Sequence, residues 1–440
     1  MIPTSRKLIL PLICGFLISI SVFAQQEKGI VGYNNWLNPW SDFKPNQSTF
    51  SEPTEILTGT ISEDIKLNKR DIYLLLGDVF VTNNATLSIE PGTIIIGDYK
   101  TKGSLTIGRG SKIIAAGTET DPIVFTSGRS IKKAGDWGGL FILGEAPLNT
   151  FGKENALNYG LKPSSYDAIT YGGDNTESNS GILQYVRIEF AGKRTKDYGY
   201  FNGLTLAGVG SQTILENIMV SYCDGNSFQI MGGDVQLNQA VSFRSTRNDY
   251  EFKDGTQTKL TNSLAIRNPY ISSSDGSRSL VLSSYNKRED ADPAKLMTNV
   301  VAENITLINV SDDLESDINV GLVQEAIYVS ADVNFRIDNS VISGYNPAVI
   351  LDDNIKLKYD NLSKIVFNRT LFNSCNGNIF QKYNSNNDDL ENWYGSSAFN
   401  NVYSKGSDLE TFIKVSDLSR PDFRLRINQI VATNDRFDDD

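Results

Sequence analysis

The chain contains no histidine in its 440 residues. Ser-His-Asp hydrolysis, Cys-His nucleophiles and zinc or iron sites with histidine ligands are therefore excluded. Clustered basic residues are missing as well, and 52 acidic residues outweigh 41 lysines and arginines to give a net charge of −11. Because phosphate backbones and anionic lipid surfaces are bound by clustered positive charge, the composition argues against nucleic acid or such a membrane surface as a partner.

Cysteine is scarce, with only Cys14, Cys223 and Cys375 in the chain, which is too few for a disulfide framework. The segments CDGNSFQ from Cys223 and CNGNIFQ from Cys375 agree at five of seven positions. Matched positions this far apart in a repeating structure lie several units from each other, beyond the reach of a disulfide bond. We expect two free, buried thiols at equivalent turns.

The first 24 residues are typical of an export signal. Arg6 and Lys7 precede an apolar run over residues 8–23, and Ala24 ends a stretch suited to cleavage. A membrane anchor is the alternative, but the apolar run is short for a bilayer span. The mature protein is expected to be exported, to the periplasm, the outer-membrane surface or the medium, and not to be an integral membrane protein.

A short strand signal recurs along the chain, in which an asparagine stands just ahead of an alternating apolar run. The asparagines are 21 to 42 residues apart, at Asn217, Asn238, Asn262, Asn304, Asn339 and Asn368. Such spacings suit the coils of a solenoid, some of them carrying a loop. Asparagine tolerates left-handed backbone angles and bonds its own turn, so the repeat predicts a stacked asparagine ladder, with a polar ligand-binding column as the alternative.

The segments between these strand signals are turns, with no room for helices. Each strand must then pair with its counterpart one coil away, which predicts an all-β fold, a single-stranded right-handed parallel β-helix (β-solenoid) with loop insertions. Residues 25–54 are expected to be an extended lead-in or a cap over the first coil, and residues 55–440 the β-helix domain. Alternation along one strand points Val186 and Ile188 inward, with Arg187 and Glu189 facing water.

Three insertions interrupt the regular coils, over residues 146–179, 271–297 and 384–404. Loops inserted at one side of a solenoid commonly build its binding face. The candidate ligand contacts are aromatic residues in such loops, for which local packing is the alternative: Tyr171, Tyr198, Tyr200, Trp393 and Tyr394.

Several phrases in the N-terminal half carry a family resemblance: TLSIEPGTIII (86–96), SLTIGRGSKIIAAGT (104–118), GDWGGLFIL (135–143) and LQYVRIEFAG (183–192). Over residues 55 to 345 the chain resembles exported right-handed β-helix proteins of Bacteroidetes-type bacteria, a functionally uncharacterised group. Relatives tend to carry dense acidic runs where this chain keeps only Asp249, Glu251 and Asp254. These three carboxylates are the candidate ligands for Ca²⁺, the one cofactor considered.

Two enzymatic routes survive without histidine. A carboxylate pair can cleave glycosides, and the best adjacent pair is Asp352 with Asp353, followed by Asp312 with Asp313. A polysaccharide lyase would use calcium on Asp249, Glu251 and Asp254 with Arg244 or Arg247 as the base.

The sequence-based prediction is a binding or scaffold module for an extended glycan or an envelope protein. The alternative is a carbohydrate-active enzyme, either a polysaccharide lyase or a carboxylate-dependent glycoside hydrolase. The binding hypothesis predicts that Asp249→Ala and Asp352→Ala are tolerated. The enzyme hypothesis predicts that one of them abolishes activity without loss of folding.

Overall fold

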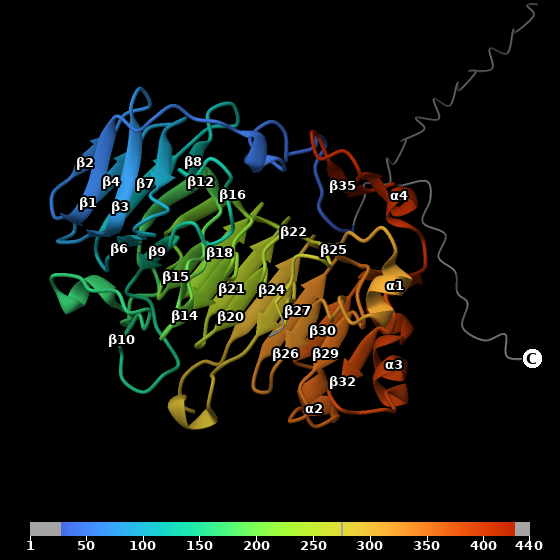
Figure 1. The fold of residues 1–440 in the computed structure, drawn as a ribbon. Helices are drawn as coiled ribbons and strands as arrows, with labels where there is room; N and C mark the ends of the chain where they lie inside the picture. Colours follow the sequence, from blue (N-terminus) through green and yellow to red (C-terminus); the bar gives the residue numbers. More distant parts are fainter. Residues whose placement is uncertain (1–27, 274–275, 427–440) are drawn as a thin grey trace, which may run out of the picture.

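One sheet of 29 strands winds through most of the chain in the computed structural model, which describes residues 28–273 and 276–426. Its strands pair in parallel and stack in three columns, here named A, B and C, along one axis from the blue to the red end of Figure 1. The prediction of an all-β, single-stranded parallel β-helix is confirmed. The predicted signal peptide lies outside the described residues.

The columns repeat in the order A, B, C around each coil. Column A contains β2 (Ile65–Leu67), β4 (Thr86–Ile89), β7 (Lys112–Ala116), the first halves of β12 (Gly181–Glu189) and β16 (Ile214–Ser221), β18 (Asp234–Asn238), β21 (Gln257–Thr261), β24 (Asn299–Glu303), β27 (Asn334–Asp338) and β30 (Ile365–Asn368).

Column B contains the first parts of β1 (Glu55–Ile61) and β3 (Ile72–Val81), β5 (Ile94–Gly97), β8 (Ile123–Ser127), the second halves of β12 and β16, β19 (Val241–Phe243), β22 (Leu264–Arg267), β25 (Thr306–Asn309), β28 (Val341–Ser343), β31 (Leu371–Asn373) and β33 (Val402–Ser404).

Column C contains the ends of β1 and β3, β6 (Leu105–Ile107), β9 (Leu140–Leu143), β15 (Leu204–Ala207), β17 (Phe228–Met231), β20 (Tyr250–Lys253), β23 (Leu280–Leu282), β26 (Ile327–Val329), β29 (Val349–Leu351) and β32 (Ile379–Gln381).

Short helices and hairpins decorate the coils: η1 (Pro45–Gln47), β10 (Asn155–Ala156), η2 (Tyr166–Ile169), β11 (Thr170–Tyr171), β13 (Arg194–Thr195), β14 (Gly199–Tyr200), η3 (Arg288–Asp290), α1 (Leu314–Asn319), α2 (Tyr359–Leu362), α3 (Asp388–Tyr394), η4 (Ser397–Phe399), α4 (Asp408–Thr411), β34 (Phe412–Lys414) and β35 (Asp422–Leu425). Among the described residues, no helix has the length and apolar character needed to span a bilayer.

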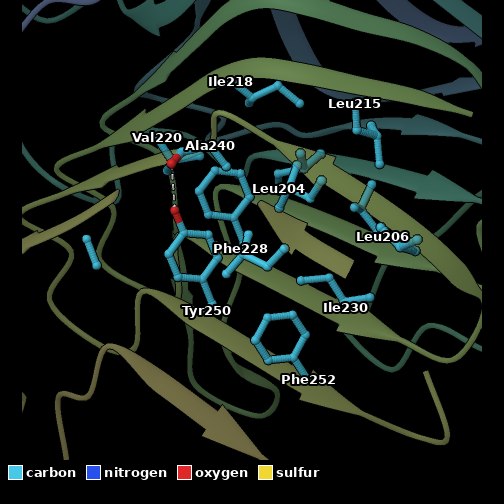
Figure 2. Packing of buried hydrophobic residues seen from close by; sticks show 14 of the residues in the cluster. Leu204, Leu206, Leu215, Ile218, Val220, Phe228, Ile230, Ala240, Tyr250 and Phe252 are labelled. Carbon is cyan, nitrogen blue, oxygen red and sulfur yellow. Dashed lines mark hydrogen bonds between the residues drawn. The ribbon is translucent and has the colours of Figure 1, made fainter. Parts of the chain in front are cut away.

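The interior of the solenoid is apolar because alternate residues of each strand point inward. Phe228 and Tyr250, paired on neighbouring coils of column C, stack with ring centroids 4.9 Å apart (Figure 2). The Tyr250 hydroxyl donates to the backbone oxygen of Ala240 or of Leu264, each 3.0 Å away, so the polar end of this buried ring is satisfied. Identical stacking from coil to coil makes the core continuous.

The corner between columns A and B uses a left-handed residue on successive coils, with φ near +50° at Asn217, Gln239, Asn262, Asn304, Asn339 and Arg369. The predicted asparagine ladder is therefore wrong at two positions, since Asn238 and Asn368 end strands β18 and β30 and the following residue takes the corner. The corner side chains do stack in part, because Asn217 Nδ2 donates to Gln239 Oε1 at 2.9 Å.

The same A-to-B corner is contacted from outside by an N-terminal strap, defined as residues 28–53. Backbone amides of consecutive strap residues bond successive coils: Gly29 to the Asn339 oxygen (2.7 Å), Ile30 to Thr306 Oγ1 (2.9 Å) and Val31 to Asn262 Oδ1 (2.8 Å). The strap thus runs back along the side of the solenoid, above β22 and β25 in Figure 1. A cap over the first coil, one of the two expectations for this segment, does not describe these contacts.

Strap side chains bury an outward-facing apolar stripe on column B. Ile30, Leu37, Trp40 and Phe43 form one buried cluster with outward residues of β16, β19, β22, β25, β28 and β31. The hairpin of β34 and β35 covers the rest of the stripe through Phe412, Val415, Phe423 and Leu425. The two ends of the described chain also meet, because Asn35 Nδ2 donates to the Pro421 oxygen at 2.6 Å.

The strap also covers charged groups that the strand pattern placed in water. Glu189 is 1% exposed, and the side chain of Arg187 is 13% exposed, so the expectation that both face solvent is wrong. Asp42 of the strap lies 3.6 Å from Arg187 Nη1, and Arg187 Nε lies 3.3 Å from Glu189 Oε1. Burial raises the pKa of Glu189 to about 7, against the opposing charge of Arg187.

Both remaining cysteines are free and stand at equivalent B-to-C corners. Each follows a left-handed residue, Tyr222 before Cys223 and Ser374 before Cys375. Cys223 is buried as predicted, whereas Cys375 is only partly buried. Burial raises the pKa of both thiols, that of Cys375 to about 12, so neither is present as the reactive thiolate near neutral pH.

Candidate functional site

A groove of about 790 Å³ lies on the outer side of column C. Its floor is formed by outward side chains of β17 and β20, namely Gln229, Met231 and Lys253. One wall is the insertion 146–179, the second is the β13–β14 hairpin, and the third is residues 285–290, which include η3. The segments that carry β10, β14 and η3 (yellow) lie together below column C in Figure 1.

The insertion is held in place because the early coils of column C are apolar on their outer side. Phe80, Phe141 and Ala207 of that side pack in one buried cluster with insertion residues Leu148, Leu157, Leu161, Ala168, Ile169 and Tyr171. The Phe141 and Phe201 rings meet edge to face at 5.5 Å, which joins the hairpin segment to the same cluster. The first two walls therefore share one core.

The first and third walls are tied to each other by backbone contacts. Thr150 and Ala291 form an antiparallel bridge, and the amide of Asp292 donates to the Asn149 oxygen at 2.8 Å. Lys295 Nζ donates to the Thr150 oxygen at 2.7 Å. Because the walls are joined through main-chain groups, the groove is formed without a ligand.

A polar network fixes the side chains of the floor. Tyr159 donates to Gln229 Oε1 at 2.7 Å, and Gln229 Nε2 donates to Glu251 Oε2 at 2.6 Å. Asn226 Nδ2 donates to the same Glu251 oxygen at 2.8 Å, and Asn202 Nδ2 donates to Gln229 Oε1 at 3.0 Å. Burial raises the pKa of Tyr159, which keeps its hydroxyl a donor.

Three of the five predicted ligand contacts meet in this groove. Tyr171, Tyr198 and Tyr200 all line it, although the exposed fractions of Tyr171 and Tyr198 differ, at 1% and 47%. The Tyr200 ring is flanked by two guanidinium groups, with Arg247 4.8 Å and Arg194 5.2 Å from its centroid.

The other two predicted contacts lie far from the groove, in α3 near the C-terminal coils. Tyr394 is buried and donates to the Ile365 oxygen at 2.9 Å. Trp393 packs edge to face on Tyr359 with centroids 5.8 Å apart. These two residues cover the last coils, so packing is their role.

Sequence reasoning missed three aromatic residues of the groove: Phe151, Tyr159 and Tyr285. Their signal was present, because all three fall in insertions that the sequence identified. What the sequence did not show is that the insertions 146–179 and 271–297 face the same groove.

The three candidate calcium ligands are not gathered into one site. Asp249 is fully buried at a B-to-C corner, Glu251 faces outward from column C, and Asp254 occupies a left-handed position after β20. Within residues 28–273 and 276–426, no group of three acidic or cysteine side chains is placed to hold a metal ion. The described structure therefore does not bring Asp249, Glu251 and Asp254 together as the ligands of one ion.

Asp249 instead belongs to a buried structural network. Arg267 Nη1 lies 3.1 Å from its Oδ2 atom, Ser242 donates to Oδ1 at 2.5 Å, and Ser279 donates to Oδ2 at 3.0 Å. The side chains of Asp249 and Arg267 are 0% and 4% exposed. No ligand can reach this carboxylate without opening the coil.

The remaining catalytic candidates have local structural partners. Asp352 accepts from the Tyr328 hydroxyl at 2.5 Å; burial raises its pKa, but the hydrogen bonds from Tyr328 and Asn354 outweigh burial and hold that pKa below its usual value. Asp353 beside it is exposed. Arg244 donates to the Tyr222 hydroxyl at 3.3 Å. It follows β19, several coils before the turn after β29 that carries Asp352 and Asp353.

The second-ranked carboxylate pair is equally local. Asp313 is the N-cap of α1, where its side chain accepts from the Ser316 amide at 3.1 Å. Asp312 is exposed next to it. Neither adjacent pair lines the groove on column C.

The fold and the groove define a parallel β-helix with a loop-walled site on the outer side of one strand column. The chain belongs to the family described as the pectate-lyase-like beta-helix domain, whose model matches residues 59–414. Comparison with curated proteins and with solved structures found no match.

Proposed function

We propose that this protein is an exported module that binds an extended glycan in the groove on column C. The observation that carries the proposal is the lining: six aromatic side chains stand among amide, hydroxyl and charged groups in one preformed hollow of about 790 Å³. Membership of the pectate-lyase-like β-helix family supports a carbohydrate-related role. Export rests on the signal predicted over residues 1–24.

Sugar chemistry fits this mixed lining. A pyranose ring has apolar C–H faces, which pack on aromatic rings, and hydroxyl edges, which need hydrogen-bond partners. Phe151 is 60% exposed and Tyr198 is 47% exposed, so both rings are available for stacking. The lining residues come from three separate walls and two strands of the floor, which offers several contact points to a chain of sugars.

Loss of an exposed ring should weaken glycan binding without unfolding the protein. Phe151→Ala and Tyr198→Ala are each expected to lower affinity about tenfold, roughly 1.4 kcal/mol, as the loss of one stacked ring implies. Titration calorimetry with neutral, acidic and amino hexasaccharides would measure this. Tyr383→Ala is the matched control, because Tyr383 is 86% exposed and lies outside the groove. Equal affinities for all three variants would contradict the proposal, and no binding of any hexasaccharide would redirect it to an envelope protein partner.

A carbohydrate-active enzyme is the second candidate, favoured by one observation. Asp254 lines the groove, and burial raises its pKa from the ordinary value despite the neighbouring Lys253. A carboxyl group that stays protonated longer suits a general acid. Glu251, held by Asn226 and Gln229 behind the floor, is close enough to Asp254 to contribute to the rise of its pKa but does not itself line the groove.

Product release separates the two candidates. An enzyme would generate new reducing ends or unsaturated sugars, Asp254→Asn would abolish them, and the rate would fall as pH rises through the raised pKa of Asp254. A binding module would release no product at any pH.

In either case Asp254 is most easily accommodated when protonated, so stability present at low pH is partly lost as pH rises through its folded pKa. Asp254→Asn is therefore expected to raise the urea midpoint relative to wild type at pH 7 more than at pH 3.

A further inference from the structure

We propose that the groove on column C selects glycans carrying positively charged amino groups and rejects glycans carrying carboxylates. This inference rests on the proposed glycan-binding function and names the ligand class. The starting observation is the charge of the lining. Four carboxylates face the groove, Glu154, Asp254, Glu289 and Asp290, against the single ammonium group of Lys253.

Internal pairing offsets two of these four carboxylates and leaves the other two unpaired among the described residues. Glu154 is paired with Arg109 outside the lining. Lys253 Nζ is 3.5 Å from the Asn286 Oδ1 atom, and its charge partly offsets that of the neighbouring Asp254. Glu289 and Asp290 are exposed in η3 and have no ion-pair partner among the described residues. An incoming cation therefore meets charges that the protein has not already used.

The aromatic walls add to the same preference. The negative face of an aromatic ring attracts ammonium groups and repels carboxylates. The Tyr200 ring already holds Arg194 and Arg247. No cation is placed over Phe151 or Tyr198 in the described structure, and both rings are largely exposed. Ring and carboxylate thus favour the same kind of sugar substituent.

An independent feature marks the groove as a ligand site. Tyr171 lines the groove and is 1% exposed, yet its hydroxyl makes no hydrogen bond within the described part of the chain. The hydroxyl itself is not enclosed by the protein, so a partner that enters the groove can reach it. An amino or hydroxyl group of a sugar supplies that partner.

A carboxylate-bearing chain would meet four carboxylates in the lining against one lysine, because Arg194 and Arg247 are already stacked on the Tyr200 ring. Acidic glycans are bound by basic side chains or through a bridging divalent cation. The described residues offer one lysine in the groove and no cluster of three acidic or cysteine ligands for a metal ion. Such a ligand would lose hydration and gain repulsion.

Three hexasaccharides of equal length test the inference: a glucosamine hexamer, its N-acetylated counterpart and a galacturonic acid hexamer. The glucosamine hexamer is expected to bind at least about fivefold more tightly than the N-acetylated hexamer, as one exposed ion pair implies. The galacturonic acid hexamer is expected not to bind. The preference should shrink in high salt, because surface charges are screened.

Two double variants assign the preference to the groove. Glu289→Gln with Asp290→Asn should bring the amino and N-acetylated hexamers to within twofold of each other. Asp312→Asn with Glu315→Gln changes the net charge equally on exposed residues outside the groove and should keep the fivefold preference. Tyr171→Phe, which removes only the unpaired hydroxyl, should weaken the glucosamine hexamer several-fold.

Each result has one meaning. Equal binding of the amino and N-acetylated hexamers, or a loss of preference in both double variants, would overturn the charge selection and leave glycan binding standing. Tightest binding of the galacturonic acid hexamer would overturn it outright. Binding of none of the three would overturn the proposed function itself.

Discussion

Asp249→Ala is expected to lower the free energy of unfolding by about 3–5 kcal/mol, because removing one partner of a buried ion pair leaves the other charge uncompensated. The stranded group would be Arg267, whose side chain is 4% exposed. Ser242 and Ser279 would lose their acceptor at the same time. Urea unfolding followed by circular dichroism measures the change.

The matched control is Asp352→Ala. Asp352 is half-buried in a turn and bonds Tyr328 and Asn354, so its loss should cost much less, on the order of 1 kcal/mol. Equal effects of the two substitutions would contradict the buried network. The sequence-based expectation that Asp249→Ala is tolerated is not supported by this environment, and loss of activity in that variant would report on folding, not on catalysis.

Trp40→Ala is expected to release the N-terminal strap from the solenoid. Trp40 is 0% exposed and meets Tyr185 edge to face at 5.9 Å, and truncating a buried tryptophan costs about 3–5 kcal/mol. Trp40 belongs to the cluster that joins the strap to column B, so the cost falls on the docking of the strap. Detachment would uncover the apolar stripe that includes Met219, Val241 and Phe243.

Limited proteolysis and dye binding would detect the release. Cleavage within residues 31–53 and binding of a hydrophobic dye should both rise in Trp40→Ala. Tyr33→Ala serves as the control, because Tyr33 is fully exposed on the same strap. A strap that stays protected in Trp40→Ala would show that its backbone contacts alone hold it.

The coils were predictable because every coil repeats the same alternation, and each run of Val, Ile and Leu fixes one inward face. The strap was not predictable, although the sequence contained one indication that a segment covers column B. In VSF (241–243) the apolar Val241 and Phe243 share one face and the polar Ser242 takes the other, and it is the apolar face that lies outside and is covered by the strap. Which segment provides the cover depends on contacts between residues more than 200 positions apart.

The site divides in the same way. Aromatic residues in loops pointed to Tyr198 and Tyr200, which line the groove from the β13–β14 hairpin; their contact with a ligand stays a prediction. The same rule failed at Trp393 and Tyr394, because the insertion near the end of the chain packs onto the last coils as α3. The prediction of Asp249 as a calcium ligand failed for another reason. A shift of one position along the chain decides whether a corner residue points into the coil or out of it.

The strap contacts the solenoid at intervals that match the spacing of the coils. Its consecutive residues Gly29, Ile30 and Val31 each bond a different coil, counting back from the coil of Asn339 to that of Asn262. Most solenoids tolerate the gain or loss of a coil, because each unit contacts only its neighbours. Here a coil added between these three would move the bonding positions on the coils away from the strap residues that bond them. The first described segment of the chain thus fixes the spacing of the three coils that it bonds.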